Sequence, residues 1–309
     1  MLSGAAVKAG VIGLIRFLPL DASMPGWGGA LAAAGLLSAF YGVAIGITQS
    51  NPKAVLGYSS VSQMGVLATV FGMGLVSGNS GTALDAAFYA AHHTLVKGAL
   101  FLAVGVAATA GARRPWPVLL PAAVLALGLG GLPLTGGALA KLVVKTPVGD
   151  GFVALLMSLS SAGTTLLMAH FLYRLAVSSA RHATPDDPSP SSLPWLAMAL
   201  ASIAVPWTVY LTVMSGAVAD AVAPAALWSA IWPMLLGGAL AIAQRRWGRL
   251  PRIPDGDIAG VAVAGATRLA RAAGLAMEWL DRVLRQWTVA GVSLLALAVV
   301  LAALMLTGH

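Results

Sequence analysis

Apolar residues along this chain come in long runs that are separated by short polar breaks. A run of about 20 residues is the length that an α-helix needs to cross the hydrocarbon core of a bilayer. The pattern therefore predicts an all-α polytopic membrane protein with about nine transmembrane helices. The runs cover residues 4–20, 27–48, 54–76, 84–110, 116–146, 151–174, 193–213, 226–244 and 287–307.

The loops between these runs alternate in charge. Almost no basic residue lies in the set that carries Asp21, Asp85, Asp150 and Asp220, whereas the other set carries Lys53 and twelve of the thirteen arginines. Short cytoplasmic loops are enriched in Lys and Arg. The alternation predicts a bacterial-type cytoplasmic (inner) membrane protein with its N-terminus inside and its C-terminus outside.

Composition agrees with a lipid environment and removes several classes of function. With 59% hydrophobic and 9% charged residues and a mean hydropathy of +0.87, the chain has too little charge to cover a soluble globule. The absence of cysteine excludes disulfides, thiolate-held iron–sulfur clusters and Cys-ligated zinc. The pI near 10.3 does not indicate a nucleic-acid surface, because the basic residues are scattered over short loops. We predict no cofactor, no metal and no nucleic-acid partner.

Residues 257–286 differ from the apolar runs. Charged residues recur there at helical spacing, opposite a row of leucines. The pattern predicts an amphipathic helix in the cytoplasmic interface, which either binds anionic lipid or packs as a strut across neighbouring helices or a neighbouring subunit. The charged set is Arg268, Arg271, Glu278, Arg282 and Arg285, and the leucines are Leu269, Leu275, Leu280 and Leu284.

Four of the five lysines lie inside apolar runs: Lys8, Lys97, Lys141 and Lys145. A charged side chain at the centre of a bilayer costs about 2.5–3.5 kcal/mol on insertion scales, so intramembrane lysines usually serve a proton, an ion or a partner. Lys8 lies near a helix end and has a second interpretation, in which its ammonium group reaches the cytoplasmic face.

The densest group of candidate residues is in the run at 84–110. Tyr89, His93 and Lys97 are spaced four residues apart and share one helical face, which predicts the wall of a hydrated proton path. Histidine changes its charge near neutral pH, as a proton carrier must. The alternative is that His93 and Lys97 are structural, with His93 bonded to a backbone carbonyl and the Lys97 ammonium group extended to the membrane surface. His92 points about 100° away and is a further candidate, with packing as its other interpretation.

The run at 116–146 predicts a broken helix. Gly130, Pro133, Gly136 and Gly137 fall in its middle, and backbone that is broken at membrane depth must line a cavity or be buried in protein. Lys141 follows the break, and Lys145 lies one turn further on the same face. For Lys145, contact with the outer interface is an equal alternative. The spacing does not match a phosphate-binding loop.

Other polar residues give weaker signals. Asp85 begins a helix, where a carboxylate favours the N-terminal end of the helix dipole. His93 and His170 are the one plausible pair of haem ligands, but nothing else supports a haem site. No nucleophile–base pair or metal-ligand spacing predicts a catalytic site.

Four stretches, GAAVKAGVIGLIRF, NPKAVLGYSSVSQMG, HHTLVKGALFLAVG and GLPLTGGALAKLVVK, occur in this order. Their order and spacing resemble the antiporter-like, proton-conducting membrane subunits of respiratory complex I, membrane-bound hydrogenases and multisubunit cation/proton antiporters. The resemblance covers at least residues 4–175. The SSVSQMG stretch looks most like the distal subunit of complex I and the large antiporter subunit.

The resemblance implies a role for individual residues. Lys8 matches the lysine of the helix that links two half-channels. His93 and Lys97 match the histidine and lysine of the central relay, and Lys141 matches the lysine of the second broken helix. Tyr89 departs from the pattern, because the distal subunit of complex I has a further histidine there.

The family also begins with about seven more helices, including a first broken helix and an intramembrane glutamate–lysine pair. We expect a partner membrane subunit to provide these helices. The other interpretation is that the start codon is assigned wrongly and that the helices are encoded upstream of Met1. The layout implies a second half-channel bundle at 1–180, two peripheral helices at 181–249 and a lateral helix with a last span at 250–309. Residues 181–193 are predicted to form an exposed linker.

The favoured hypothesis for the function is a proton- or proton/cation-translocating subunit, and the alternative is a non-conducting assembly or anchoring subunit.

Overall fold

A computed structural model describes residues 2–110, 116–181, 192–247, 257–285 and 287–307, and within these ranges the chain is α-helical without strands. Most of the linker predicted at 181–193, together with Arg113 and Arg114, lies outside the described residues. The helices are α1 (Leu2–Phe17), α2 (Pro25–Gly46), α3 (Pro52–Ser77), α4 (Thr82–Ala110), α5 (Trp116–Gly130), α6 (Gly136–Val148), α7 (Phe152–Arg181), α8 (Ser192–Thr212), α9 (Val218–Val222), α10 (Pro224–Trp247), α11 (Asp257–Leu284) and α12 (Trp287–Thr307).

The helices account for the predicted apolar runs and confirm a polytopic all-α membrane protein. Among the described residues, seven helices are long and apolar enough to cross a membrane: α2, α3, α4, α7, α8, α10 and α12. The first run is α1, with 16 residues. The run at 116–146 is divided into α5 and α6, as predicted for a broken helix. The sequence pattern did not predict the five-residue helix α9.

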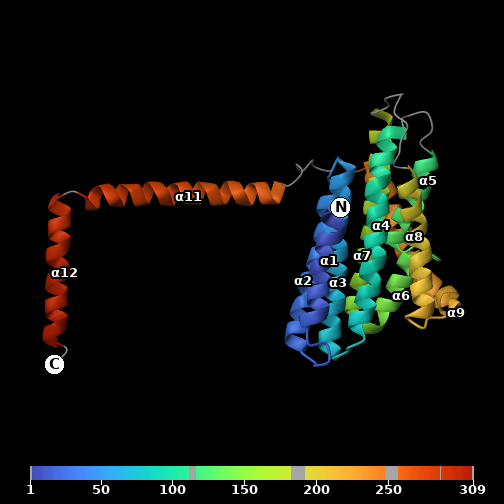
Figure 1. The fold of residues 1–309 in the computed structure, drawn as a ribbon, viewed down its shortest axis with the longest axis horizontal. Coiled ribbons are helices and arrows are strands. Elements are labelled where there is room, and N and C mark those ends of the chain that lie inside the picture. Colours follow the sequence, from blue (N-terminus) through green and yellow to red (C-terminus); the bar gives the residue numbers. More distant parts are fainter. Residues whose placement is uncertain (1, 111–115, 182–191, 248–256, 286, 308–309) are drawn as a thin grey trace. The chain divides into compact units, whose positions relative to one another are not determined.

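The chain divides into two compact units, residues 1–253 and 254–309. In the first unit, α1 to α4 run side by side (Figure 1). The second unit holds α11 and α12. Helix α11 is continuous over 28 residues, about 42 Å at 1.5 Å per residue, and Leu269, Leu275 and Leu280 are exposed along it. The amphipathic helix is therefore present where the sequence predicts it.

The ends of α3 follow directly from its sequence. The Asn51 side chain accepts a hydrogen bond from the Lys53 backbone N–H at 2.9 Å, and Pro52 occupies the first turn, where its missing N–H is not needed. At the other end, Gly78 adopts a left-handed conformation with φ +64°. Glycine tolerates this conformation, so the helix stops there.

Helices α2 and α3 pack with their backbones unusually close together. A Cβ atom at Gly35 would lie 2.6 Å from the Gly65 carbonyl oxygen, and one at Gly42 would lie 2.6 Å from the Ser62 backbone nitrogen. Small residues at helix interfaces allow such an approach, which lets dispersion contacts hold the pair together in lipid.

Helix α4 is central to the first unit, because it contacts α1, α3, α5, α6, α7 and α8. It contributes Leu100 and Ala103 to one buried apolar cluster and Ala86 and Phe88 to another. The same helix carries the candidate residues at 89–97. The fold therefore places the predicted chemistry on a helix against which six other helices pack.

Candidate functional site

Lys97 is fully buried inside the helix bundle, with a relative exposure of 0%. Its Nζ donates a hydrogen bond to the Leu56 backbone carbonyl on α3 at 2.7 Å. Ser60 Oγ donates to the same carbonyl oxygen. The ammonium group is thus held by a backbone oxygen, and no ion pair with it occurs among the described residues.

Lys8 and His93 bring α1 and α4 into direct polar contact. Lys8 Nζ lies 2.8 Å from His93 Nδ1 and 3.5 Å from the Met64 sulfur on α3. Lys8 is partly buried and His93 is completely buried. Since Lys8 makes these contacts inside the bundle, its side chain does not extend to the end of α1.

Tyr89 belongs to a chain of neutral hydrogen bonds that crosses the bundle. Its hydroxyl donates to Gln63 Oε1, and Gln63 Nε2 donates to Thr164 Oγ1 at 2.9 Å. Thr164 Oγ1 in turn donates to the Ser160 carbonyl at 3.0 Å. Sequence reasoning missed Gln63 and Thr164, because single uncharged polar residues in apolar helices do not reveal their partners.

His92 lies against the start of α6. The side chain is 3% exposed, and neither ring nitrogen has a hydrogen-bond partner among the described residues. A Cβ atom at Gly136 would approach His92 Nδ1 to 2.6 Å, and one at Gly137 would approach Nε2 to 3.3 Å. The glycines of the break therefore make room for this imidazole. A narrow internal gap is lined by His92, Tyr89, Gln63 and Gly137.

The break between α5 and α6 consists of tight turns whose polar groups are largely paired. Gly131 and Leu134 have positive φ angles of 103° and 63°. The Gly131 N–H donates to the Gly128 carbonyl at 2.9 Å, and Trp207 Nε1 on α8 donates to the Leu134 carbonyl at 2.9 Å. Pro133 lies within the break. These bonds satisfy backbone groups that a bilayer would otherwise leave unpaired.

Lys141 reaches back from α6 to the end of α5. Its Nζ donates to the Gly130 carbonyl, a group that the interruption of the helix frees. The lysine thus combines two properties: it stabilises the broken backbone, and it holds an ionisable group at the break.

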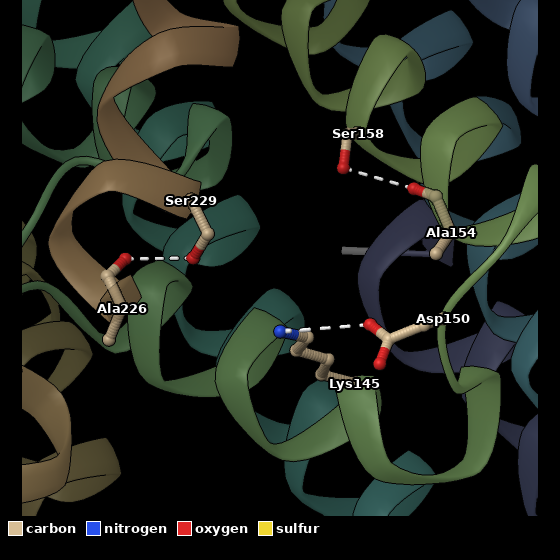
Figure 2. Close-up of polar contacts among 6 residues, drawn as sticks. All are labelled: Lys145, Asp150, Ala154, Ser158, Ala226 and Ser229. Carbon is tan, nitrogen blue, oxygen red and sulfur yellow. Dashed lines mark hydrogen bonds and ion pairs between the residues drawn. The ribbon is translucent and has the colours of Figure 1, made fainter.

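A pocket of about 290 Å³ adjoins Lys141. Tyr89 and Lys141 contribute to its lining, and so do Lys145 and Asp150 near the end of α6. Figure 2 shows Lys145 directed towards Asp150, with their Nζ and Oδ1 atoms 4.0 Å apart. Tyr89 lines both this pocket and the narrow gap beside His92.

The fold thus distributes the predicted residues over two regions. Lys8, His93 and Lys97 lie where α1, α3 and α4 meet, while Lys141 and Lys145 follow the break. His170 lies elsewhere, with Nε2 2.8 Å from the Gln49 carbonyl. Among the described residues, no group of three or more His, Cys, Asp or Glu side chains could hold a metal ion.

Comparison with known proteins finds a match over the part of the chain that carries these residues. The family described as NADH:quinone oxidoreductase/Mrp antiporter, TM, matches residues 1–167, which is more than half of the chain.

Individual relatives match shorter parts. The A/B subunit of a probable K(+)/H(+) antiporter from Rhizobium meliloti is 31% identical over 150 residues, which are 45% of this chain and 15% of that protein. The A subunit of an Na(+)/H(+) antiporter from Alkalihalophilus pseudofirmus is 30% identical over 114 residues, which are 34% of this chain and 14% of that protein. The matched region is therefore a small part of these relatives.

A solved structure extends the likeness of fold to the whole chain. The structure of the Mrp complex from Dietzia sp. DQ12-45-1b matches with a TM-score of 0.71 and 23% identity. The match covers 100% of this chain and 37% of the other chain.

Proposed function

The chain belongs to the NADH:quinone oxidoreductase/Mrp antiporter transmembrane family, and from that membership we propose that it is a proton- or proton/cation-translocating membrane subunit of a larger complex. Relatives named as subunits of K(+)/H(+) and Na(+)/H(+) antiporters support this function. The relay residues are Lys8, His93, Lys97 and Lys141, with Tyr89, His92 and Lys145 as further members.

The observation that carries the proposal is the 2.8 Å contact between Lys8 Nζ and His93 Nδ1. Two side chains that can each gain and lose a proton meet there inside an apolar bundle. When the Lys8 ammonium donates its proton to Nδ1, an amine and an imidazolium result. Nε2 has no hydrogen-bond partner among the described residues, so it releases the second ring proton when a water molecule reaches it as the acceptor. The ring thereby passes one proton without rotating.

Lys141 forms the second station of the proposed path. Between the two stations lie the Tyr89–Gln63 pair and His92, around the narrow gap beside α6. From Lys141, the 290 Å³ pocket continues to Lys145 and Asp150. Water in the pocket would carry a proton between Lys141 and Lys145. The gap beside His92 has no room for a water molecule, so transfer there would require the surrounding helices to move apart.

A division of labour along the chain follows from the same proposal. Residues 1–180 form the half-channel bundle, 181–249 provide two peripheral helices, and 250–309 provide a lateral helix and the last span. Lys8, Lys97 and Lys141 have no carboxylate partner among the described residues. Another membrane subunit would supply the acidic groups and the other half-channel.

A non-conducting assembly or anchoring subunit is the second candidate. The matched region makes up only 14–15% of the length of the relatives. The buried lysines favour transport, because a scaffold has no use for an ammonium group that is costly to bury.

One experiment separates the two candidates. Everted membrane vesicles that contain the assembled complex are assayed for cation-dependent collapse of a proton gradient, with Lys141→Ala and His93→Ala as test variants. We expect both to reduce transport by about tenfold or more, while the amount of assembled complex is unchanged. Lys53→Ala is the matched control, since Lys53 is an exposed lysine at the start of α3. Normal transport by both assembled test variants would establish the scaffold instead.

A further inference from the structure

The pocket beside α6 extends from the interior of the bundle to its exposed surface. Lys141, which holds the broken backbone, lines it together with Tyr89. At the exposed end, the side chains of Lys145 and Asp150 are 61% and 95% exposed. Lys145 and Asp150 thus lie at the exposed end of the pocket whose interior end is lined by Lys141.

The backbone places Asp150 beside Lys145. Helix α6 ends at Val148, and the two residues that flank Asp150 are glycines with positive φ, +69° at Gly149 and +132° at Gly151. The Gly149 N–H donates to the Lys145 carbonyl at 2.9 Å. The chain is thereby turned so that Asp150 Oδ1 lies 4.0 Å from Lys145 Nζ. This turn requires glycine on both sides, because residues with side chains rarely adopt such φ values.

The pocket wall also offers hydroxyl oxygens that suit water. Ser158 Oγ donates to the Ala154 carbonyl at 3.0 Å, and Ser229 Oγ donates to the Ala226 carbonyl at 2.8 Å (Figure 2). A hydroxyl has one hydrogen and two acceptor lone pairs. With their hydrogens used within their own helices, these serines present acceptor oxygens to the pocket, which water can fill.

The charges of the lining disfavour a metal cation. The ionisable residues that line the pocket include two lysines, Lys141 and Lys145, and one carboxylate, Asp150. Alkali and alkaline-earth ions bind where several carboxylate and carbonyl oxygens converge. A proton needs no such cage, since it can move through water and hydroxyl groups.

We propose that Lys145 is a specificity-determining residue that keeps metal cations out of this pocket, and that Asp150 is a positioning residue that holds Lys145 and partly offsets its charge. The pocket then admits water and carries protons to or from Lys141. The ion that this half of the path carries is then the proton. This inference rests on the proposed transport function.

Because the chain has no cysteine, the charge selectivity of the pocket can be measured without any transport assay. Ser161→Cys places a thiol on the pocket wall. The full chain, in membranes, is treated with two methanethiosulfonate reagents of similar size, the cationic aminoethyl and the anionic sulfonatoethyl compound. The reaction rate of each reagent with the thiol at position 161 is divided by the rate of the same reagent with Ser77→Cys. Ser77 is an exposed position that is not part of the pocket lining.

Lys145→Gln and Asp150→Asn should change the charge selectivity of the pocket in opposite directions. With Lys145 present, we expect the anionic reagent to react faster with the introduced pocket thiol than the cationic one does. Lys145→Gln should lower the ratio of anionic to cationic rates by roughly three- to tenfold, and Asp150→Asn should raise it, because these changes remove one positive and one negative charge from the pocket. Lys53→Gln, which removes a positive charge elsewhere, should leave the ratio unchanged.

Two results would overturn the inference. One is a thiol at position 161 that neither reagent reaches, which would mean that the pocket holds lipid or is closed to water. The other is a ratio that stays the same in both Lys145→Gln and Asp150→Asn. Either result would leave the vesicle assay of Lys141→Ala untouched, so failure of the filter and failure of the proposed transport function are distinguishable.

Discussion

Lys8 on α1 and His93 on α4 are 85 positions apart in the chain, yet their side-chain nitrogens lie 2.8 Å apart. Hydrogen bonds of this length between ionisable groups allow a proton to transfer without any movement of the backbone. The contact therefore couples two helices and two titratable groups in the proposed path.

The coupling between Lys8 and His93 can be measured with a double-mutant cycle. Lys8→Met and His93→Gln should each reduce transport by about tenfold or more, and the double variant should be no slower than the slower single variant, because both break the same transfer step. Initial rates of gradient collapse in everted vesicles provide the readout. Independent effects that multiply in the double variant would show that the two residues act separately.

Replacing Lys97 should separate transport from stability. Lys97→Met keeps most of the side-chain volume and removes a buried charge, so the assembled complex should retain its thermal stability within a few degrees, while transport falls. Leu100→Ala, at an equally buried position of α4, should destabilise the protein by about 2–5 kcal/mol through the cavity it leaves. If Lys97→Met lowered the Tm as much as Leu100→Ala does, Lys97 would be a structural residue.

The close packing of α2 and α3 predicts an unequal response to two glycine substitutions. Gly42→Ala should destabilise the first unit by about 1–3 kcal/mol, because the added methyl group meets the backbone of Ser62. Gly29→Ala on the same helix should be neutral or slightly stabilising, since no atom lies within 4 Å of the added carbon. Thermal unfolding in detergent measures both variants. Equal melting temperatures would contradict the observed approach of the two helices.

The charge alternation of the loops predicts that Asp150 and Arg181 lie on opposite sides of the membrane. Asp150→Cys should react with an impermeant thiol reagent added to intact cells, and Arg181→Cys should react only after the membrane is opened. The chain has no native cysteine, so no background reaction interferes. Labelling of both positions from the same side would refute an N-terminus inside and a C-terminus outside.

We expect the purified chain to be insufficient for conduction. Among the described residues, no carboxylate is paired with Lys8, Lys97 or Lys141, so no acidic partner in this part of the chain stabilises the charged form of these lysines during transport. Proteoliposomes that contain the chain alone should show no proton or sodium flux above that of empty liposomes. A flux that Lys141→Ala abolishes would show instead that the half-channel suffices.

Much of the fold was predictable because the bilayer imposes a simple rule on sequence. A helix that crosses lipid must satisfy its own backbone and present apolar side chains, so the spans can be recognised by length and hydropathy. Glycines and Pro133 in the middle of a run likewise marked the break before α6. The short helix α9 was not predicted, since five residues are too few to show a period.

The candidate site was predictable in part, for an equally physical reason. Charged residues such as Lys97 and Lys141 stand out in an apolar run because burying them is costly. Gln63 and Thr164 could not be identified, because neutral polar side chains pass unnoticed in transmembrane helices. The partners of the lysines were also hidden, since Lys97 and Lys141 donate to the backbone carbonyls of Leu56 and Gly130, and a carbonyl is present at every residue.

The sequence by itself determined which segments cross the membrane, where the helix breaks and which buried groups can carry charge, because these are properties of single segments and their cost in lipid. The tertiary structure alone decided that Lys8 meets His93, that His92 lies against the glycines of the break, and that a pocket leads from Lys141 to Lys145 and Asp150. Such contacts depend on how separate helices rotate and approach one another. Because lipid provides almost no hydrophobic driving force between helices, the pattern of apolar residues does not specify these contacts.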